Sequence, residues 1–185
     1  MQEQRKYLTE DELTRFLRGI ESVRDTAIFT VSYWRGLRAA EVGQLRLSDW
    51  DRNEHRLFVH RGKGSESGSY PLSPAENRAL KAWFRTRGAA PGPLFPSRQG
   101  TKGMGRQMVF VLYREYAIRA GLPKSLQHPH CLKHSIGTHL AGKIDLMAVK
   151  DWLGHSDFRS TLVYSKFRSR ERDKAAAQVF EQLNP

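Results

Sequence analysis

Residues 56–72 carry the one clear β-strand pattern in this chain, and that scarcity constrains the fold more than any other feature. Residues 56–61 predict a strand, Gly62-Lys63-Gly64 predicts a turn, and residues 68–72 predict a returning strand. Helix signals dominate the rest of the sequence. We therefore expect a mainly α domain with a small antiparallel β-sheet (an α+β fold) inserted early in the chain.

Two helices announce their starts by capping patterns. Thr9 with Glu12 forms a capping box ahead of a helix over residues 10–20. Ser73 with Glu76 forms another, with proline at the first helical position, ahead of a helix that runs to about residue 85. Further helices are predicted over residues 24–34, 39–45, 106–120, 130–141, 145–153 and 160–167, with a tail helix over about 171–183.

The sequence also predicts the main loop between these helices and the end of one helix. The stretch from residue 88 to 105 is rich in Gly, Pro and Ser, which predicts a long surface connection. Its apolar interruption, Leu94-Phe95-Pro96, is expected to anchor it to the core. Gly154 follows the 145–153 helix and is expected to end it in a left-handed conformation.

The charge balance points to a polyanionic partner. Lys and Arg number 31 against 19 Asp and Glu among 185 residues, a net charge of +12, which most simply suits nucleic acid. A basic but merely soluble surface is the alternative. Cys131 is the only cysteine, so no internal disulfide is possible. The chain shows neither a secretory signal nor an apolar run of about 18 residues, so we expect no membrane partner and a cytoplasmic, nucleoid-associated protein.

Histidines crowd the predicted 130–141 helix. His130, Lys133 and His134 follow an i, i+3, i+4 spacing and can share one face. A solvated polar face is one interpretation. A metal site built from these with His128 and His139 is another, but Lys133 would repel a cation and zinc usually takes a carboxylate or thiolate among its ligands. We expect no metal and no cofactor.

Three more blocks flank this helix in the sequence. Gly36-Leu37-Arg38-Ala39-Ala40-Glu41 places an arginine at a helix mouth, Leu153-Gly154-His155 places a histidine past a helix end, and Tyr164 follows nine residues later. Taken singly, each has a plain structural explanation: a surface arginine, a turn lysine at position 63, a core tyrosine. Their order along one basic chain is a more specific signal.

In that order the blocks resemble the catalytic domains of the tyrosine recombinase (phage integrase) family, from about Tyr7 to the end of the chain. The family carries an Arg in a GLR-x-x-E-like block, a Lys on a β-turn, an H-x-x-R-H helix, an LGH segment and a nucleophilic Tyr. The matching positions here are Arg38, Glu41, Lys63, His130, Lys133, His134, His155 and Tyr164.

The resemblance implies a site-specific DNA recombinase or integrase that needs neither ATP nor metal. Tyr164 would attack a phosphodiester, displace a 5′-hydroxyl and leave a 3′-phosphotyrosyl enzyme. Arg38 would hold the non-bridging oxygens, and His155 would donate a hydrogen bond to them. Lys63 would protonate the leaving oxygen. His130 would help to remove or hold the tyrosine proton, with Glu41 and His134 in support.

One position departs from the family pattern. Lys133 stands where the second arginine is normal, and a lysine keeps the charge but loses the planar fork. Losing one such donor can cost roughly 3 kcal/mol, about a hundredfold in rate. A natural variant, an engineered slow mutant and a lineage drifting toward DNA binding are the explanations. We favour a natural variant that is active but slower.

The domain organisation expected from the resemblance is a single catalytic domain over residues 1–185, with a core at 8–167 and a tail helix at 168–185. We expect the family's N-terminal DNA-clamping domain to be absent from this chain. The partner would be double-stranded DNA, bound by a tetramer, with a monomer or weak oligomer when free. The tail would pack on its own core or on a neighbouring protomer. A DNA-binding module without efficient cleavage and a type IB topoisomerase-like activity are the alternative functions.

Overall fold

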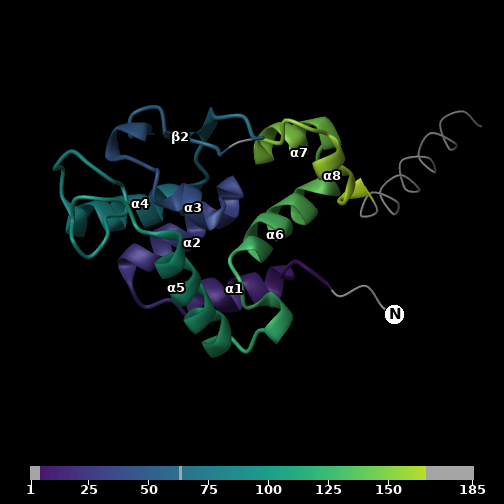
Figure 1. Cartoon of the computed structure of the whole chain (residues 1–185), viewed down its shortest axis with the longest axis horizontal. Helices are drawn as coiled ribbons and strands as arrows, with labels where there is room; N and C mark the ends of the chain where they lie inside the picture. The colour runs from purple at the N-terminus through teal and green to yellow at the C-terminus, as the bar shows by residue number, and fades with distance from the viewer. Residues whose placement is uncertain (1–4, 63, 166–185) are drawn as a thin grey trace, which may run out of the picture.

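The computed structural model describes residues 5–62 and 64–165, which form helices gathered around one small sheet (Figure 1). Lys63 and residues 166–185 lie outside the described part, and with them the predicted tail helix. In chain order the elements are α1 (Glu10–Arg18), α2 (Val23–Arg35), α3 (Ala39–Val42), η1 (Leu47–Asp49), β1 (Trp50–Asp51), β2 (Arg56–Val59), β3 (Gly68–Pro71), α4 (Pro74–Arg87), α5 (Arg106–Arg119), η2 (Lys124–Leu126), α6 (His130–Ala141), α7 (Leu146–Leu153) and α8 (Arg159–Leu162).

Helix α2 is the central element of the core. Ala27, Ile28, Phe29 and Val31 are fully buried, so this helix is apolar on more than one face, as a helix surrounded by protein must be. It packs on α4 on one side and on α6 on the other. The core therefore joins the half of the molecule that holds the sheet to the half that holds α6, α7 and α8 (Figure 1).

The predicted hairpin is confirmed as β2 and β3, which pair antiparallel with Val59 opposite Gly68. A third strand, β1, pairs on the other side of β2, giving the order β1-β2-β3. At two residues β1 is too short to leave a pattern in the sequence. Strand β2 ends at Val59, two residues earlier than expected. Leu57 and Val59 point into the core from this strand.

The capping signals are confirmed where the structure describes them. The Thr9 hydroxyl accepts from the Glu12 amide, and the Ser73 hydroxyl accepts from the Glu76 amide. Gly154 caps α7 with φ of +63°, in the left-handed region that favours glycine. The connection over 88–105 contains no helix or strand, and both Leu94 and Phe95 are buried, as expected of its anchor.

Helix α3 is shorter than the predicted 39–45. It stops at Val42, and the backbone of Gly43, the next residue, lies against the carbonyl of Met104, a contact that leaves no room for a side chain. Helix α8 covers 159–162 rather than 160–167, and the end of that prediction lies outside the described residues. The predicted fold class, mainly α with a small antiparallel sheet, is confirmed.

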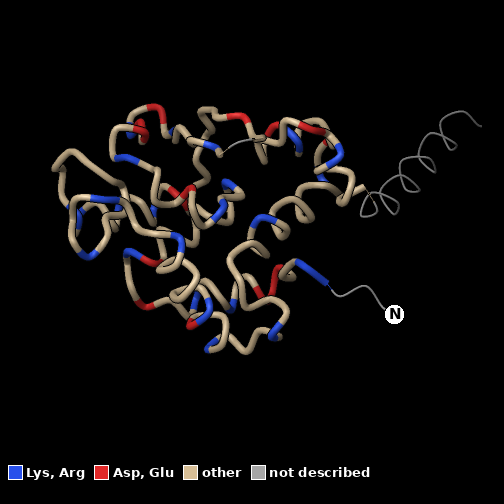
Figure 2. The backbone as a smooth tube through the Cα atoms, in the orientation of Figure 1, with Lys and Arg blue, Asp and Glu red and all other residues tan. Residues whose placement is uncertain are grey.

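Basic side chains are spread along the whole backbone rather than confined to one element (Figure 2). No helix within the described ranges is long and apolar enough to cross a membrane.

Candidate active site

The turn after α2 places Arg38 at the start of α3. Gly36 ends α2 with φ of +56°, and a β-carbon there would lie 2.6 Å from the Leu153 side chain. Glycine is thus required by both the conformation and the close approach. This approach brings the Arg38 block next to the Leu153-Gly154-His155 block, although 115 residues separate Arg38 from Leu153 in the sequence.

Glu41 is the buried carboxylate that holds Arg38. It accepts the Arg38 amide at 2.8 Å and the Arg38 guanidinium at 3.0 Å, and it also pairs with Arg61 at 3.1 Å. Burial by itself would raise the pKa of Glu41. The Arg38 amide and the charges of Arg61, Lys133 and Arg38 outweigh it, so the pKa lies below its ordinary value. The carboxylate is therefore ionised and fixes the arginine.

Lys133 lies in the interior of this arrangement. Its side chain comes from α6, is 3% exposed, and donates from Nζ to the Leu153 carbonyl at 2.9 Å. Burial, reinforced by the positive charges of Arg61 and Arg38 and opposed by Glu41, lowers the pKa of Lys133 to about 7. Near neutrality this amine is therefore shared between its charged and uncharged forms.

His155 stands at the end of α7 and is also buried. Its Nδ1 is 3.0 Å from the Thr161 hydroxyl, which fixes the ring orientation and leaves Nε2 for another partner. Burial, together with the charges of Lys133 and the two nearby arginines, lowers the pKa of His155 to about 4. The imidazole is thus neutral at pH 7.

The tip of the β2–β3 hairpin docks beside His155. Ser65 forms an isolated antiparallel bridge with His155, and the Glu66 amide donates to the Gly154 carbonyl at 2.9 Å. Ser156 donates to the Gly64 carbonyl at 2.8 Å. The neighbours of Lys63 along the chain are therefore held at the site, while Lys63 itself lies outside the described residues.

Tyr164 is buried against α6. Its ring covers Gly137, where a β-carbon would overlap the ring atoms, and its hydroxyl lies 3.4 Å from Nδ1 of His134. Burial raises the pKa of Tyr164 to about 12, and burial with neighbouring His130 lowers the pKa of His134 to about 4. The role predicted for His130, to hold or remove the tyrosine proton, stays a prediction, and the imidazole within reach of the phenol is that of His134.

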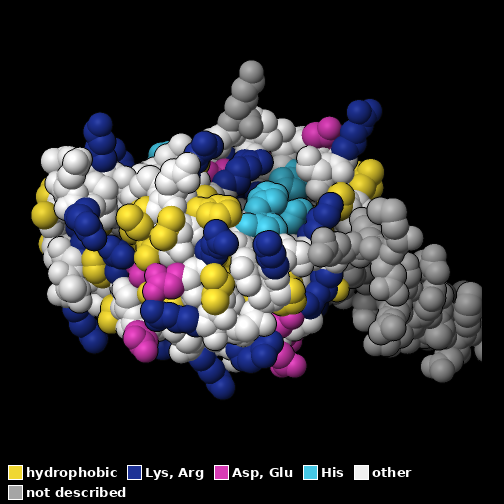
Figure 3. Space-filling model, turned by 60° about the horizontal axis from the view of Figure 1, so that its bottom comes forward, with side chains coloured by type: hydrophobic (Ala, Val, Ile, Leu, Met, Phe, Trp, Pro, Cys, Tyr) yellow, Lys and Arg dark blue, Asp and Glu magenta, His cyan; other side chains and the backbone are white. Residues whose placement is uncertain are grey.

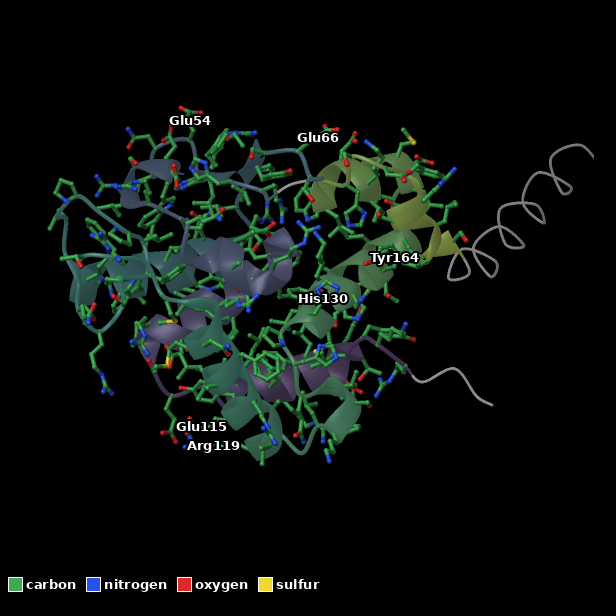
Figure 4. The ribbon with its side chains drawn as sticks, viewed as in Figure 1. Glu54, Glu66, Glu115, Arg119, His130 and Tyr164 are labelled. Atoms are coloured by element: carbon green, nitrogen blue, oxygen red, sulfur yellow. The ribbon has the colours of Figure 1, made fainter. Side chains whose placement is uncertain are left out.

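His130 occupies the outer part of the same histidine pair. Its ring meets the His134 ring edge to face at 4.6 Å between centroids, and Figure 4 shows His130 and Tyr164 on the same side of the molecule, beside α6. Burial, followed by the charge of Lys133, lowers its pKa. The two imidazoles are therefore available as neutral hydrogen-bonding groups.

A hollow of about 410 Å³ opens beside this pair. Figure 3 shows the histidines as a patch with lysine and arginine side chains around it. The surroundings suit an anion, since no carboxylate lines the hollow. Over residues 5–62 and 64–165, no three His, Cys, Asp or Glu side chains are placed to hold a metal ion. The lining residues are Arg5, Lys6, Ser125, His128, His130 and His134.

Two buried arginines near the site have no counterpart among the predicted site residues. Arg35 pairs with Glu76 at 2.9 Å and stacks on Trp152, and Arg61 reaches Glu41; both arginine side chains are essentially unexposed. Charged residues at a helix end and a strand end ordinarily lie at the surface, so no local pattern marks them.

Fold and site together define the catalytic domain of a tyrosine recombinase. The model of the phage integrase family matches residues 6–171. The chain therefore belongs to that family, and the family and recombinase class predicted from the sequence blocks are confirmed.

Among curated relatives, the chain is 33% identical over 170 residues to the type 1 fimbriae regulatory protein FimB of Escherichia coli (strain K12), covering 87% of this chain and 84% of that protein. It is 37% identical over 165 residues to the tyrosine recombinase XerC of Xanthomonas axonopodis pv. citri, covering 88% of this chain but 52% of that one. The crystal structure of XerA recombinase superposes with a TM-score of 0.80 at 24% identity, and the match covers 100% of this chain and 67% of the XerA chain.

Proposed function

We propose that this chain is a site-specific DNA recombinase that cleaves and rejoins DNA strands through a 3′-phosphotyrosyl intermediate on Tyr164. The observation that carries the proposal is the convergence of four distant segments. Contacts join these segments at one site. They are the Arg38–Glu41 pair, the hairpin tip, residues Lys133 and His134 of α6, and the segment from His155 to Tyr164. Membership of the phage integrase family supports the same chemistry.

Cleavage would proceed by in-line displacement at phosphorus. The Tyr164 oxygen forms a bond to phosphorus as the bond to the 5′-oxygen breaks, and a proton passes to that oxygen from Lys63. The phenol must lose its own proton, which its buried position resists. Because Nδ1 of His134 lies 3.4 Å from the hydroxyl, we assign to His134 the contact that holds the tyrosine proton and takes it up as the oxygen bonds to phosphorus, with His130 in support.

Binding of the phosphate would fall to three groups. Arg38 offers a half-exposed guanidinium held by Glu41, and His155 offers Nε2 while Thr161 holds its other nitrogen. Lys133 supplies a point charge and not the two-pronged contact of an arginine. We therefore expect a cleavage rate about a hundredfold lower than an arginine would give.

We further propose a single catalytic domain with its core at 8–167 and a tail at 168–185, acting on double-stranded DNA as a tetramer assembled on that DNA. The net charge of +12 and the basic hollow beside His130 support a DNA partner.

The experiment is covalent capture. DNA sites are selected from a randomised duplex pool by binding to the Tyr164→Phe protein, nicked near the crossover position so that cleavage is trapped, and incubated with each variant before denaturing electrophoresis. We expect an adduct with the parent, none with Tyr164→Phe and more with Lys133→Arg.

If DNA binds and neither the parent nor Lys133→Arg yields an adduct, the cleavage assignment fails and a DNA-binding module takes its place. Relaxation of a supercoiled plasmid without a selected site would instead favour a topoisomerase-like activity.

A further inference from the structure

Arg61 is a buried cation outside the family pattern. It follows strand β2 and stands two residues before Lys63, and its side chain is 0% exposed. A guanidinium taken out of water is costly unless its donors are satisfied, so the position of this one needs an explanation.

The guanidinium spans the ends of two helices. Nη2 donates to the carbonyl of Arg35 at 2.6 Å and reaches that of Trp152 at 3.5 Å. Nη1 donates to the carbonyl of Gly36 at 3.1 Å. These carbonyls belong to the last turns of α2 and α7, where unpaired carbonyls and the helix dipoles favour a positive charge.

The same guanidinium reaches into the site. Nη1 also donates to Glu41, the carboxylate that holds Arg38. Gly154, the residue before His155, packs over the arginine so closely that a β-carbon would lie 3.1 Å from Nε. One side chain thus touches the Arg38 block and the His155 block while belonging to the hairpin of Lys63.

We propose that Arg61 is a positioning residue for strand cleavage: it holds the Arg38 segment, the described tip of the hairpin and the His155 segment in one arrangement, and its charge acts on Lys133. The inference rests on the proposed function for its catalytic half only. The electrostatic half concerns the protein without DNA.

The groups that face Lys133 come from three other segments. The charges are those of Arg61 from the hairpin and of Arg38 and Glu41 from the start of α3, and the uncharged Leu153 carbonyl of α7 accepts from the amine. Lys133 and Arg61 reach neighbouring carbonyls of α7, those of Leu153 at 2.9 Å and Trp152 at 3.5 Å, and Arg61 is first among the charges that act on the amine. Replacing it by a neutral residue removes a repulsive charge, so Lys133 should hold its proton to higher pH.

The first test measures Lys133 directly, without DNA. Protein labelled with ¹³C at lysine Cε is titrated by NMR, and Lys133→Arg identifies the resonance. We expect the Lys133 pKa to rise in Arg61→Gln and to stay near the parent value in Arg61→Lys, which keeps the charge. Arg35→Lys is the matched control, because it alters the packing of the neighbouring buried cation but keeps its charge. It should leave the pKa of Lys133 unchanged. An unchanged titration in Arg61→Gln would overturn the electrostatic half.

The second test measures covalent capture. Arg61→Lys loses the fork that bridges the helix ends, and misplacement by about 1 Å can cost about a hundredfold in rate. We expect capture to fall by tenfold or more in Arg61→Lys while DNA binding changes less than threefold. Capture at the parent rate in Arg61→Lys would overturn the positioning role, and this variant suffices if Arg61→Gln does not fold. If the parent itself forms no adduct, the proposed function fails and the positioning role with it, while the NMR titration still decides the electrostatic half.

Discussion

The charge state of Lys133 should control how cleavage depends on pH. Its pKa of about 7 means that about half of the free protein carries the charge at pH 7 and about 1% at pH 9. His134 and His155, with pKa values of about 4, stay neutral across this range, and Tyr164, at about 12, stays protonated. Among these four described site residues, Lys133 is thus the group expected to change charge between pH 7 and 9.

We expect single-turnover capture at subsaturating DNA to fall by tenfold or more from pH 7 to pH 9. In Lys133→Arg the guanidinium stays charged throughout, so the fall should be less than about threefold. At saturating DNA the parent should lose less, because a bound phosphate stabilises the ammonium. Parallel pH profiles for the parent and Lys133→Arg would refute the argument.

The same pKa also predicts how stability depends on pH, with no DNA present. The folded-state value of about 7 lies below the ordinary 10.5, so the unfolded chain binds more protons between these values. The free energy of unfolding should therefore rise with pH over that window, by about 1 kcal/mol per pH unit from this group. Urea denaturation of the parent and Lys133→Met at pH 7 and 9 tests the sign, since the methionine variant lacks this rise. Equal pH dependence in both proteins would contradict the buried, neutralising amine.

Two further changes have effects that the structure fixes. Gly43→Ala would push a β-carbon into a backbone carbonyl of the 88–105 connection and should lower the free energy of unfolding, measured in urea, by about 1–3 kcal/mol. Gly62→Ala is the control, because nothing lies close to a β-carbon there, and it should change the free energy of unfolding by less than half as much. Equal effects of the two substitutions would show that the contact at Gly43 is absent. Thr161→Val removes the partner of His155 Nδ1 and should slow covalent capture by about tenfold, the value of one hydrogen bond, while Thr161→Ser should retain most of the rate. Capture at the parent rate in Thr161→Val would mean that the hydroxyl does not orient the ring.

The starts of α1 and α4 and the end of α7 could be predicted because their signals are local, whereas the end of α3 could not. Thr9 with Glu12 and Ser73 with Glu76 satisfy amides within three residues of themselves, and Gly154 adopts a conformation that other residues disfavour. The family blocks could also be identified in the sequence, because their order and spacing are properties of the chain alone. The fold class and the list of candidate residues followed from these.

Only the tertiary structure decided which groups are buried away from water and which groups they contact. Nothing near Arg61 or Lys133 in the sequence signals burial, since that depends on helices α2 and α7 closing over them from distant parts of the chain. The pairing of Tyr164 with His134 rather than His130 likewise depends on how the segment after α7 packs on α6 at Gly137. Desolvation and charge proximity are non-local quantities, so the pKa values that shape this site arise from packing and not from residue type.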